Sequence, residues 1–160
     1  MPGAIAGALK QRSQFKSREQ EVLLGLRTAT ARALEPWEKF LKTSADLTPN
    51  QYNVLRILRG SHPSRLACGE IADRMISRDP DITRLVDRLS ARGLVDRVRS
   101  ARDRRVVEVG VTPKGRAVLR GLDVHAERMP RALLGGLGPR KLMQLAALLE
   151  QVLREMGTYP

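Results

Sequence analysis

The densest cluster of charge in the sequence lies between residues 97 and 105, where five arginines stand against one carboxylate. Guanidinium groups present several donors in a fixed planar array that matches phosphate oxygens. More arginines flank a polar turn further upstream, with Arg78 inside it and Arg84 and Arg88 after it. These groups predict contacts with a polyanion rather than bond-making chemistry. The first cluster consists of Arg97, Arg99, Arg102, Asp103, Arg104 and Arg105.

The composition of the whole chain has the same bias. Its 160 residues include 29 Lys and Arg against 17 Asp and Glu, a formal net charge of +12. This length predicts one domain with a core of its own. Aromatic residues make up only 3%, which argues against a surface on which unpaired bases would stack. Duplex nucleic acid is therefore the polyanion that the composition favours.

The single cysteine, Cys68, excludes an intramolecular disulfide and a zinc site with several cysteines. A redox-sensing thiol and an inert, buried thiol remain alternatives for it. His62 and His125 have no clustered second ligand type, so we expect no metal, no cofactor and no catalysis. The sequence has neither a convincing signal peptide nor an apolar run of membrane-spanning length, which predicts a cytoplasmic protein without membrane contact.

The N-terminal part of the chain reads as helical. Residues 1–16 show no hydrophobic period and are expected to form a flexible arm. Apolar residues then recur at three- and four-residue steps over residues 18–44, which predicts a long helix that Pro36 should kink. A capping box over Thr48–Gln51 starts a second helix, which we expect to end at Gly60 before a polar loop.

The next segment has the pattern of two helices joined by a turn. A short helix is predicted over residues 68–75. After the turn, Asp79 is expected to cap and Pro80 to open a further helix that ends at Gly93. Asp79 and Asp81 fit the helix start as caps better than as readers of cytosine. The predicted outer face of this helix carries Asp81, Thr83, Arg84, Asp87, Arg88 and Arg92.

The rest of the chain combines a hairpin with two more helices. Two β-branched runs, residues 94–99 and 106–112, predict antiparallel strands with a basic tip between them. Helices are expected over residues 113–134 and 139–156, because each has a proline at its first turn and a regular apolar stripe. Thr112 is expected to cap the first of these two helices. The order of elements is that of a helix-turn-helix followed by a β-hairpin wing.

Four short motifs, in order and at characteristic spacing, resemble those of MarR-family transcriptional regulators. The resemblance covers about residues 20–156 and implies a mainly α fold with a small β-hairpin wing (α+β), a winged helix-turn-helix with N- and C-terminal dimerisation helices. It also implies a homodimer that binds a pseudo-palindromic duplex operator, most often as a repressor. The motifs are LTP at 47–49, ITRLVDRLSARGLV at 82–95, DRR at 103–105 and VTPKG at 111–115.

The same resemblance assigns parts of the chain. It implies one domain over residues 17–160, in which 17–46 and 113–160 are dimerisation helices and 47–112 is the DNA-binding portion. Family pockets for small-molecule effectors lie between these parts, which makes Trp37, Leu41 and Tyr52 candidate lining residues; the alternative is that they are ordinary core.

Matched residue by residue, the resemblance places Arg105 in the minor groove and gives Asp103 the role of fixing the wing arginines. A narrow minor groove concentrates negative potential and attracts a guanidinium. The turn from Arg78 to Asp81 departs from the small hydroxyl residues usual in the family, which leaves individual base contacts open. The expected DNA-binding residues are Ser77, Arg78, Thr83, Arg84, Arg88, Arg99, Arg102, Asp103, Arg104 and Arg105.

The function that these features predict is a cytoplasmic, DNA-binding repressor that associates with the nucleoid when bound. One alternative is a winged-helix module that binds a protein and not DNA, which would require an acidic partner. Another is a regulator that senses redox state through Cys68.

Overall fold

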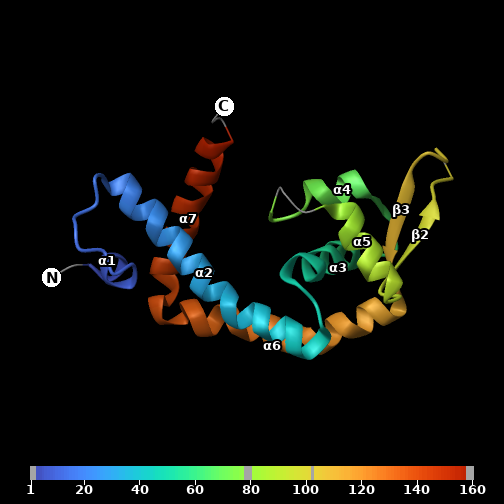
Figure 1. Cartoon of the computed structure of the whole chain (residues 1–160), viewed down its shortest axis with the longest axis horizontal. Helices are drawn as coiled ribbons and strands as arrows, with labels where there is room; N and C mark the ends of the chain where they lie inside the picture. Colours follow the sequence, from blue (N-terminus) through green and yellow to red (C-terminus); the bar gives the residue numbers. More distant parts are fainter. Residues whose placement is uncertain (1–2, 78–80, 102, 158–160) are drawn as a thin grey trace. The chain divides into compact units, whose positions relative to one another are not determined.

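The computed structural model describes residues 3–77, 81–101 and 103–157, and they form two compact units, Met1–Leu122 and Asp123–Pro160 (Figure 1). The predicted division of the chain at residue 113 into a binding portion and a dimerisation portion stays a prediction. The elements in chain order are α1 (Ala4–Ala8), α2 (Arg18–Ala45), α3 (Pro49–Ser61), β1 (Leu66–Ala67), α4 (Cys68–Asp73), α5 (Ile82–Ala91), β2 (Val95–Arg99), β3 (Val107–Val111), α6 (Pro113–Leu134), the 3-10 helix η1 (Gly135–Leu137) and α7 (Gly138–Met156).

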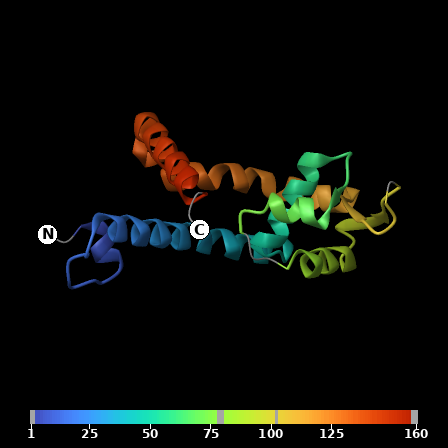
Figure 2. The same cartoon turned by 90° about the horizontal axis from the view of Figure 1, so that it is seen from above.

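Helix α2 starts at the predicted residue and ends one residue later than predicted, at Ala45. It runs as one uninterrupted helix (Figure 2). The side chain of Ser17 accepts a hydrogen bond from the backbone N–H of Gln20, which satisfies a donor at the helix start. Pro36 lies inside the helix and is exposed. Asp46, the residue directly after the helix, has a left-handed φ of 49° and forms its C-terminal cap.

The N-terminal segment differs from the flexible arm that was expected. It forms helix α1, which packs against α2 and buries Ala6. Arg32 of α2 donates a hydrogen bond to the Ala8 carbonyl at 3.2 Å. A Cβ on Gly25 would lie 2.8 Å from the Ile5 side chain, so the two helices approach closely where α2 has no side chain. Five residues are too few to show a helical period, which is why the sequence gives no signal for α1.

The capping box predicted for α3 is confirmed. The Thr48 hydroxyl accepts a hydrogen bond from the Gln51 N–H at 3.3 Å, and the Gln51 side chain accepts one from the Thr48 N–H at 3.0 Å. Pro49 takes the first helical position, where it costs no hydrogen bond. This start fixes where α3 leaves the end of α2.

We expect Thr48→Ala to lower the free energy of unfolding by about 1 kcal/mol, because the Gln51 N–H loses its acceptor. Urea denaturation followed by circular dichroism measures the change. Thr43→Ala is the matched control, since the Thr43 hydroxyl only returns a hydrogen bond to carbonyls of its own helix. Equal stability of Thr48→Ala and the wild type would contradict the role of the box.

The sheet has three antiparallel strands in the order β1, β3, β2. The predicted hairpin is confirmed as β2 and β3, with Val95 opposite Val111 and Arg99 opposite Val107. We call this hairpin, residues 95–111, the wing. Strand β1 was not predicted; it pairs Leu66 with Val109 and is too short to show alternation.

The core of the first unit lies between α2, α3, α4, α5, the sheet and the start of α6. Its side chains come from every one of these elements. The buried side of α5 therefore packs closely against the core, which holds the exposed side of the helix in place. The most deeply buried side chains are Leu41, Leu47, Val54, Leu55, Leu58, Ile71, Val86, Leu89, Leu94, Val109 and Leu119.

Helix α5 begins two residues later than predicted, at Ile82. Its cap is Asp81, whose carboxylate accepts a hydrogen bond from the Arg84 N–H at 3.2 Å. The predicted cap and opening residue, Asp79 and Pro80, lie outside the described residues. The end is as predicted, because Gly93 takes a left-handed φ of +67° that side chains rarely adopt.

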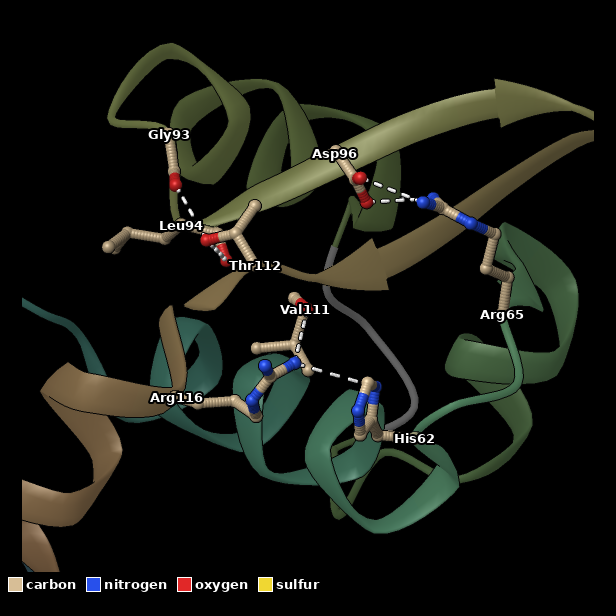
Figure 3. Close-up of polar contacts among 8 residues, drawn as sticks. All are labelled: His62, Arg65, Gly93, Leu94, Asp96, Val111, Thr112 and Arg116. Carbon is tan, nitrogen blue, oxygen red and sulfur yellow. Dashed lines mark hydrogen bonds and ion pairs between the residues drawn. The ribbon is translucent and has the colours of Figure 1, made fainter. Parts of the chain in front are cut away.

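The start of α6 is seated against the start of β2 (Figure 3). The Thr112 hydroxyl donates to the Gly93 carbonyl at 2.8 Å, and the Thr112 N–H donates to Leu94 at 3.1 Å. The Gly115 N–H in turn donates to the Thr112 hydroxyl, which confirms the predicted cap. A Cβ on Gly115 would lie only 2.2 Å from the Leu94 carbonyl oxygen, so this backbone contact requires a glycine.

Candidate nucleic-acid interface

The outer face of α5 carries the predicted contact residues. Because Ile82, Val86 and Leu89 point into the core, the helical period turns Thr83, Arg84 and Arg88 outward. All three are exposed. Asp81 pairs with Arg84 at 3.1 Å between Oδ2 and Nε, and both side chains are more than half exposed. Such surface pairs contribute little free energy, so the guanidinium can exchange this carboxylate for a phosphate.

The tip of the wing is shaped by its own backbone. The Ser100 N–H donates to the Val106 carbonyl, and the Val106 N–H donates to the Asp103 carbonyl, both at 2.9 Å. The Asp103 carboxylate accepts a hydrogen bond from the Arg105 N–H at 2.9 Å. Asp103 thus fixes the turn through the backbone, and the action on arginine side chains expected of it stays a prediction. The side chains of Arg104 and Arg105 are exposed.

Helix α5 and the wing share one concave surface. A pocket of about 400 Å³ is lined by Thr83 of α5, by Arg97 and Arg105 of the wing, and by Cys68 at the start of α4. The cysteine is half-buried. Since the same hollow touches α5 and the wing, a single extended ligand could contact both of them. Its other lining residues are Ala67, Gly69, Val106 and Val107.

Arg97 has a role that its place in the basic cluster did not predict. Its guanidinium forms an ion pair with Asp87 on α5, so it connects β2 to the helix. From the sequence alone, Arg97 was one of the charges of the basic cluster. The structure instead shows it neutralising the carboxylate that α5 presents on its outer face.

Arg92 is a second residue whose role the sequence did not reveal. Placed on the outer face of α5 by the sequence, it donates hydrogen bonds to the carbonyls of Ala45 and Asp46 at 2.7 and 2.6 Å. These carbonyls end α2 and have no partner within their helix. Lys114 at the start of α6 donates to the Arg92 carbonyl at 2.8 Å. The end of α5 is thus tied to both α2 and α6.

Of the remaining predicted contact residues, the structure describes two and leaves two undescribed. Ser77 and Arg99 are exposed. Arg78 and Arg102 lie outside the described residues. The DNA contacts assigned to all these positions stay predictions.

Two of the three residues proposed to line an effector pocket, Trp37 and Tyr52, pack against each other. Trp37 lies edge-on to Tyr52 with ring centroids 5.0 Å apart, and stacks on Phe40 at 5.7 Å. Trp37 and Leu41 are buried. This cluster fills the contact of α2 with α3, and its role in binding an effector stays a prediction.

Neither a metal cluster nor a membrane-spanning helix is found in the described part of the chain. Within residues 3–77, 81–101 and 103–157, no group of three or more His, Cys, Asp and Glu side chains is arranged to hold a metal ion. None of the helices that the structure describes is both long and apolar enough to span a membrane.

The chain is similar to known proteins over most of its length. A family model described as the MarR family matches residues 45–106. The HTH-type transcriptional regulator YkoM of Bacillus subtilis is 29% identical over 144 residues, which is 88% of this chain and 92% of YkoM.

Solved structures extend the similarity. The crystal structure of a MarR transcription factor from Planctomyces limnophilus is 40% identical with a TM-score of 0.63, and the match covers 86% of this chain and 99% of that one. The structure of BpsR from Bordetella bronchiseptica, described with the regulation of its DNA binding by 6-hydroxynicotinic acid, is 27% identical with a TM-score of 0.75 and covers 92% and 100%.

Proposed function

Because the chain belongs to the MarR family of transcriptional regulators, we propose that it represses transcription by holding two copies of its α5 and wing surface against one inverted-repeat DNA duplex. The observation that carries the proposal is the shared hollow, in which Thr83 of α5 and Arg105 of the wing line one surface. One duplex can therefore reach both elements at once.

Each element suits a different groove. Helix α5, with Thr83, Arg84 and Arg88 outward, has the form of a helix that enters a major groove. Arginine there can read guanine, and threonine can hold phosphate. The wing tip with Arg104 and Arg105 fits the neighbouring minor groove, whose negative potential attracts guanidinium groups.

The second unit supplies the surface for pairing two copies. Helix α7 buries none of its residues within the chain, and much of its apolar stripe is exposed. A contiguous apolar surface of this kind is typical of a protein interface. In a two-fold dimer, the two α5 helices would read half-sites about 10 base pairs apart. The exposed apolar residues of α7 are Met143, Leu148, Leu149, Val152, Leu153 and Met156.

We expect the double variant Leu149→Glu with Leu153→Glu to be monomeric, because it places two charges one turn apart on this stripe. Sedimentation velocity measures the change. The control is Gln144→Glu with Gln151→Glu, which adds the same charge on the polar side of α7 and should leave the dimer intact. A dimer of unchanged strength in the first variant would remove α7 from the interface.

The proposal includes a small-molecule effector that releases the DNA. BpsR gives the precedent of a MarR-like protein whose DNA binding responds to a small aromatic acid. The aromatic cluster of Trp37 and Tyr52, at the contact of α2 with α3, is where we propose that such a molecule acts. Quenching of the Trp37 fluorescence by candidate aromatic acids tests it, and unchanged fluorescence at saturating effector would argue against this location.

Selection of bound duplexes from a random library tests the main proposal. We expect an inverted repeat to be enriched, and we expect the logarithm of its affinity to fall steeply with the logarithm of the salt concentration. A protein-binding module would enrich no duplex and would show negligible affinity at any salt concentration. That outcome would overturn the proposal.

A further inference from the structure

Arg65 forms an ion pair through two hydrogen bonds, and it lies outside every predicted contact. Its two terminal nitrogens donate to the two carboxylate oxygens of Asp96, each at 2.7 Å. A parallel, two-bond pair of this kind is stronger and more directional than a single contact. The hydrogen bond from Arg65 lowers the pKa of Asp96, so the carboxylate stays ionised at neutral pH.

The pair crosses the sheet. Arg65 directly precedes the edge strand β1, whereas Asp96 lies on the opposite edge strand β2, with β3 between them. Figure 3 shows the Arg65 side chain extending from the segment before β1 to reach Asp96. This contact therefore connects the segment before β1 directly to β2, in addition to the backbone ladders that both edge strands form with β3.

Gly110 on the middle strand makes room for the crossing. It is the direct partner of Asp96 in the β2 and β3 register. A Cβ on Gly110 would lie 3.0 Å from the Arg65 Nη1 and 3.0 Å from the Asp96 Oδ1. An added Cβ would therefore require the ends of the Arg65 and Asp96 side chains to shift by a few tenths of an ångström, which disturbs the ion pair.

The opposite face of β2 is held as well. Successive side chains of a strand point to opposite faces, so Asp96 and Arg97 leave β2 in opposite directions. Arg97 pairs with Asp87 of α5 on its side, while Asp96 pairs with Arg65 on the other. The base of the wing is fixed from both faces at two consecutive residues. Further out, Val98 and Val107 are exposed, so the tip has little packing of its own.

We propose that Arg65, Asp96 and Gly110 form a clamp that sets the direction of the wing for DNA binding without touching the DNA. The three are positioning residues that act through Arg104 and Arg105. A hairpin of two strands is barely stable by itself, and a wing held in its bound direction loses less conformational freedom on binding. The proposal rests on the proposed function, since it concerns how the same surface meets the duplex.

Asp96→Asn separates this idea from simple electrostatics. Removing a negative charge from a basic protein should strengthen binding to DNA if charge alone matters. If the clamp positions the wing, Asp96→Asn should instead bind the selected operator duplex about tenfold more weakly, which is the effect expected when a misdirected wing loses one charged contact with the DNA. Gly110→Ala leaves the net charge unchanged and should weaken binding in the same direction. The matched control is Asp73→Asn, which neutralises an exposed carboxylate on α4 and should bind as tightly as the wild type or more tightly.

Fluorescence anisotropy with the operator and with a scrambled duplex of equal length gives the deciding readout. A misdirected wing lowers the ratio of the operator affinity to the affinity for the scrambled duplex. Partial unfolding lowers both affinities by the same factor and leaves this ratio unchanged. Hydrogen exchange of the free protein should be faster in residues 95–111 of both clamp variants and unchanged elsewhere.

The outcomes distinguish the two proposals. If the wild type binds no duplex, the proposed function fails. If the wild type binds and both clamp variants keep its operator affinity and its affinity ratio, the clamp is wrong while the function stands. If Asp96→Asn does not fold, Gly110→Ala decides alone, by the same ratio and the same exchange measurement.

Discussion

Replacing Gly115 by alanine should lower the free energy of unfolding by about 3 kcal/mol, which is the upper part of the range for inserting atoms into a packed region. The new Cβ would lie 2.2 Å from the Leu94 carbonyl oxygen and 2.9 Å from a methyl group of Val111. The first of these atoms is backbone and is also the acceptor for Thr112. The start of α6 must therefore move away from β2. For a chain of this length we expect the melting temperature to fall by about 6 to 12 °C.

Gly121→Ala is the matched control for this prediction. Gly121 lies in the same helix, and a Cβ added there would meet no atom within 4 Å. Alanine is favoured over glycine inside a helix by up to about 1 kcal/mol, so this variant should be as stable as the wild type or more stable. Differential scanning calorimetry compares the two. If Gly115→Ala had the same melting temperature as Gly121→Ala, the close contact with the Leu94 carbonyl would not require a glycine at position 115.

The double variant Arg104→Ala with Arg105→Ala should show the largest loss of DNA affinity. Both side chains are exposed at the wing tip, where each can neutralise phosphate or enter the minor groove. A contact of this kind contributes about 1 to 3 kcal/mol, and each lost phosphate contact should reduce the salt slope by about 1. Anisotropy titrations of the operator at several salt concentrations give both quantities.

The control removes a charge without touching the wing. Arg120→Ala neutralises an exposed guanidinium on α6, so it reports the effect of net charge alone. We expect Arg120→Ala to reduce the operator affinity by less than the double variant does, even when the effect is divided by the number of charges removed. Sedimentation should show dimers for both variants. Unchanged affinity in the double variant would remove Arg104 and Arg105 from the mechanism.

Signals that act over a few residues predicted the element boundaries well. The capping box at Thr48 and the cap at Thr112 with Pro113 fix the starts of α3 and α6, because their hydrogen bonds join residues three positions apart. The outer face of α5 followed from the helical period in the same way. Two neighbouring aspartates blurred the start of α5, since either Asp79 or Asp81 satisfies the local rule.

Contacts across the fold could not be predicted by the same means. Arg65 and Asp96 are 31 residues apart, and Arg92 and Asp46 are 46 apart. No local pattern pairs such residues, because the pairing depends on how the sheet and helices stack. The segment around Arg65 therefore read as a polar loop, and Arg97 read as one more charge of a basic tip. Helix α1 and strand β1 were missed because they are shorter than the periods that identify them.

Arg92 connects the end of α5 to the end of α2 and to the start of α6. Its side chain holds the last carbonyls of α2, and its own carbonyl is held by Lys114 of α6. A displacement of the last turn of α2 must either drag α5 along with it or break two hydrogen bonds. Helix α5 therefore cannot tilt relative to α2 without breaking the two hydrogen bonds of the Arg92 guanidinium, which lies about one turn beyond Arg88.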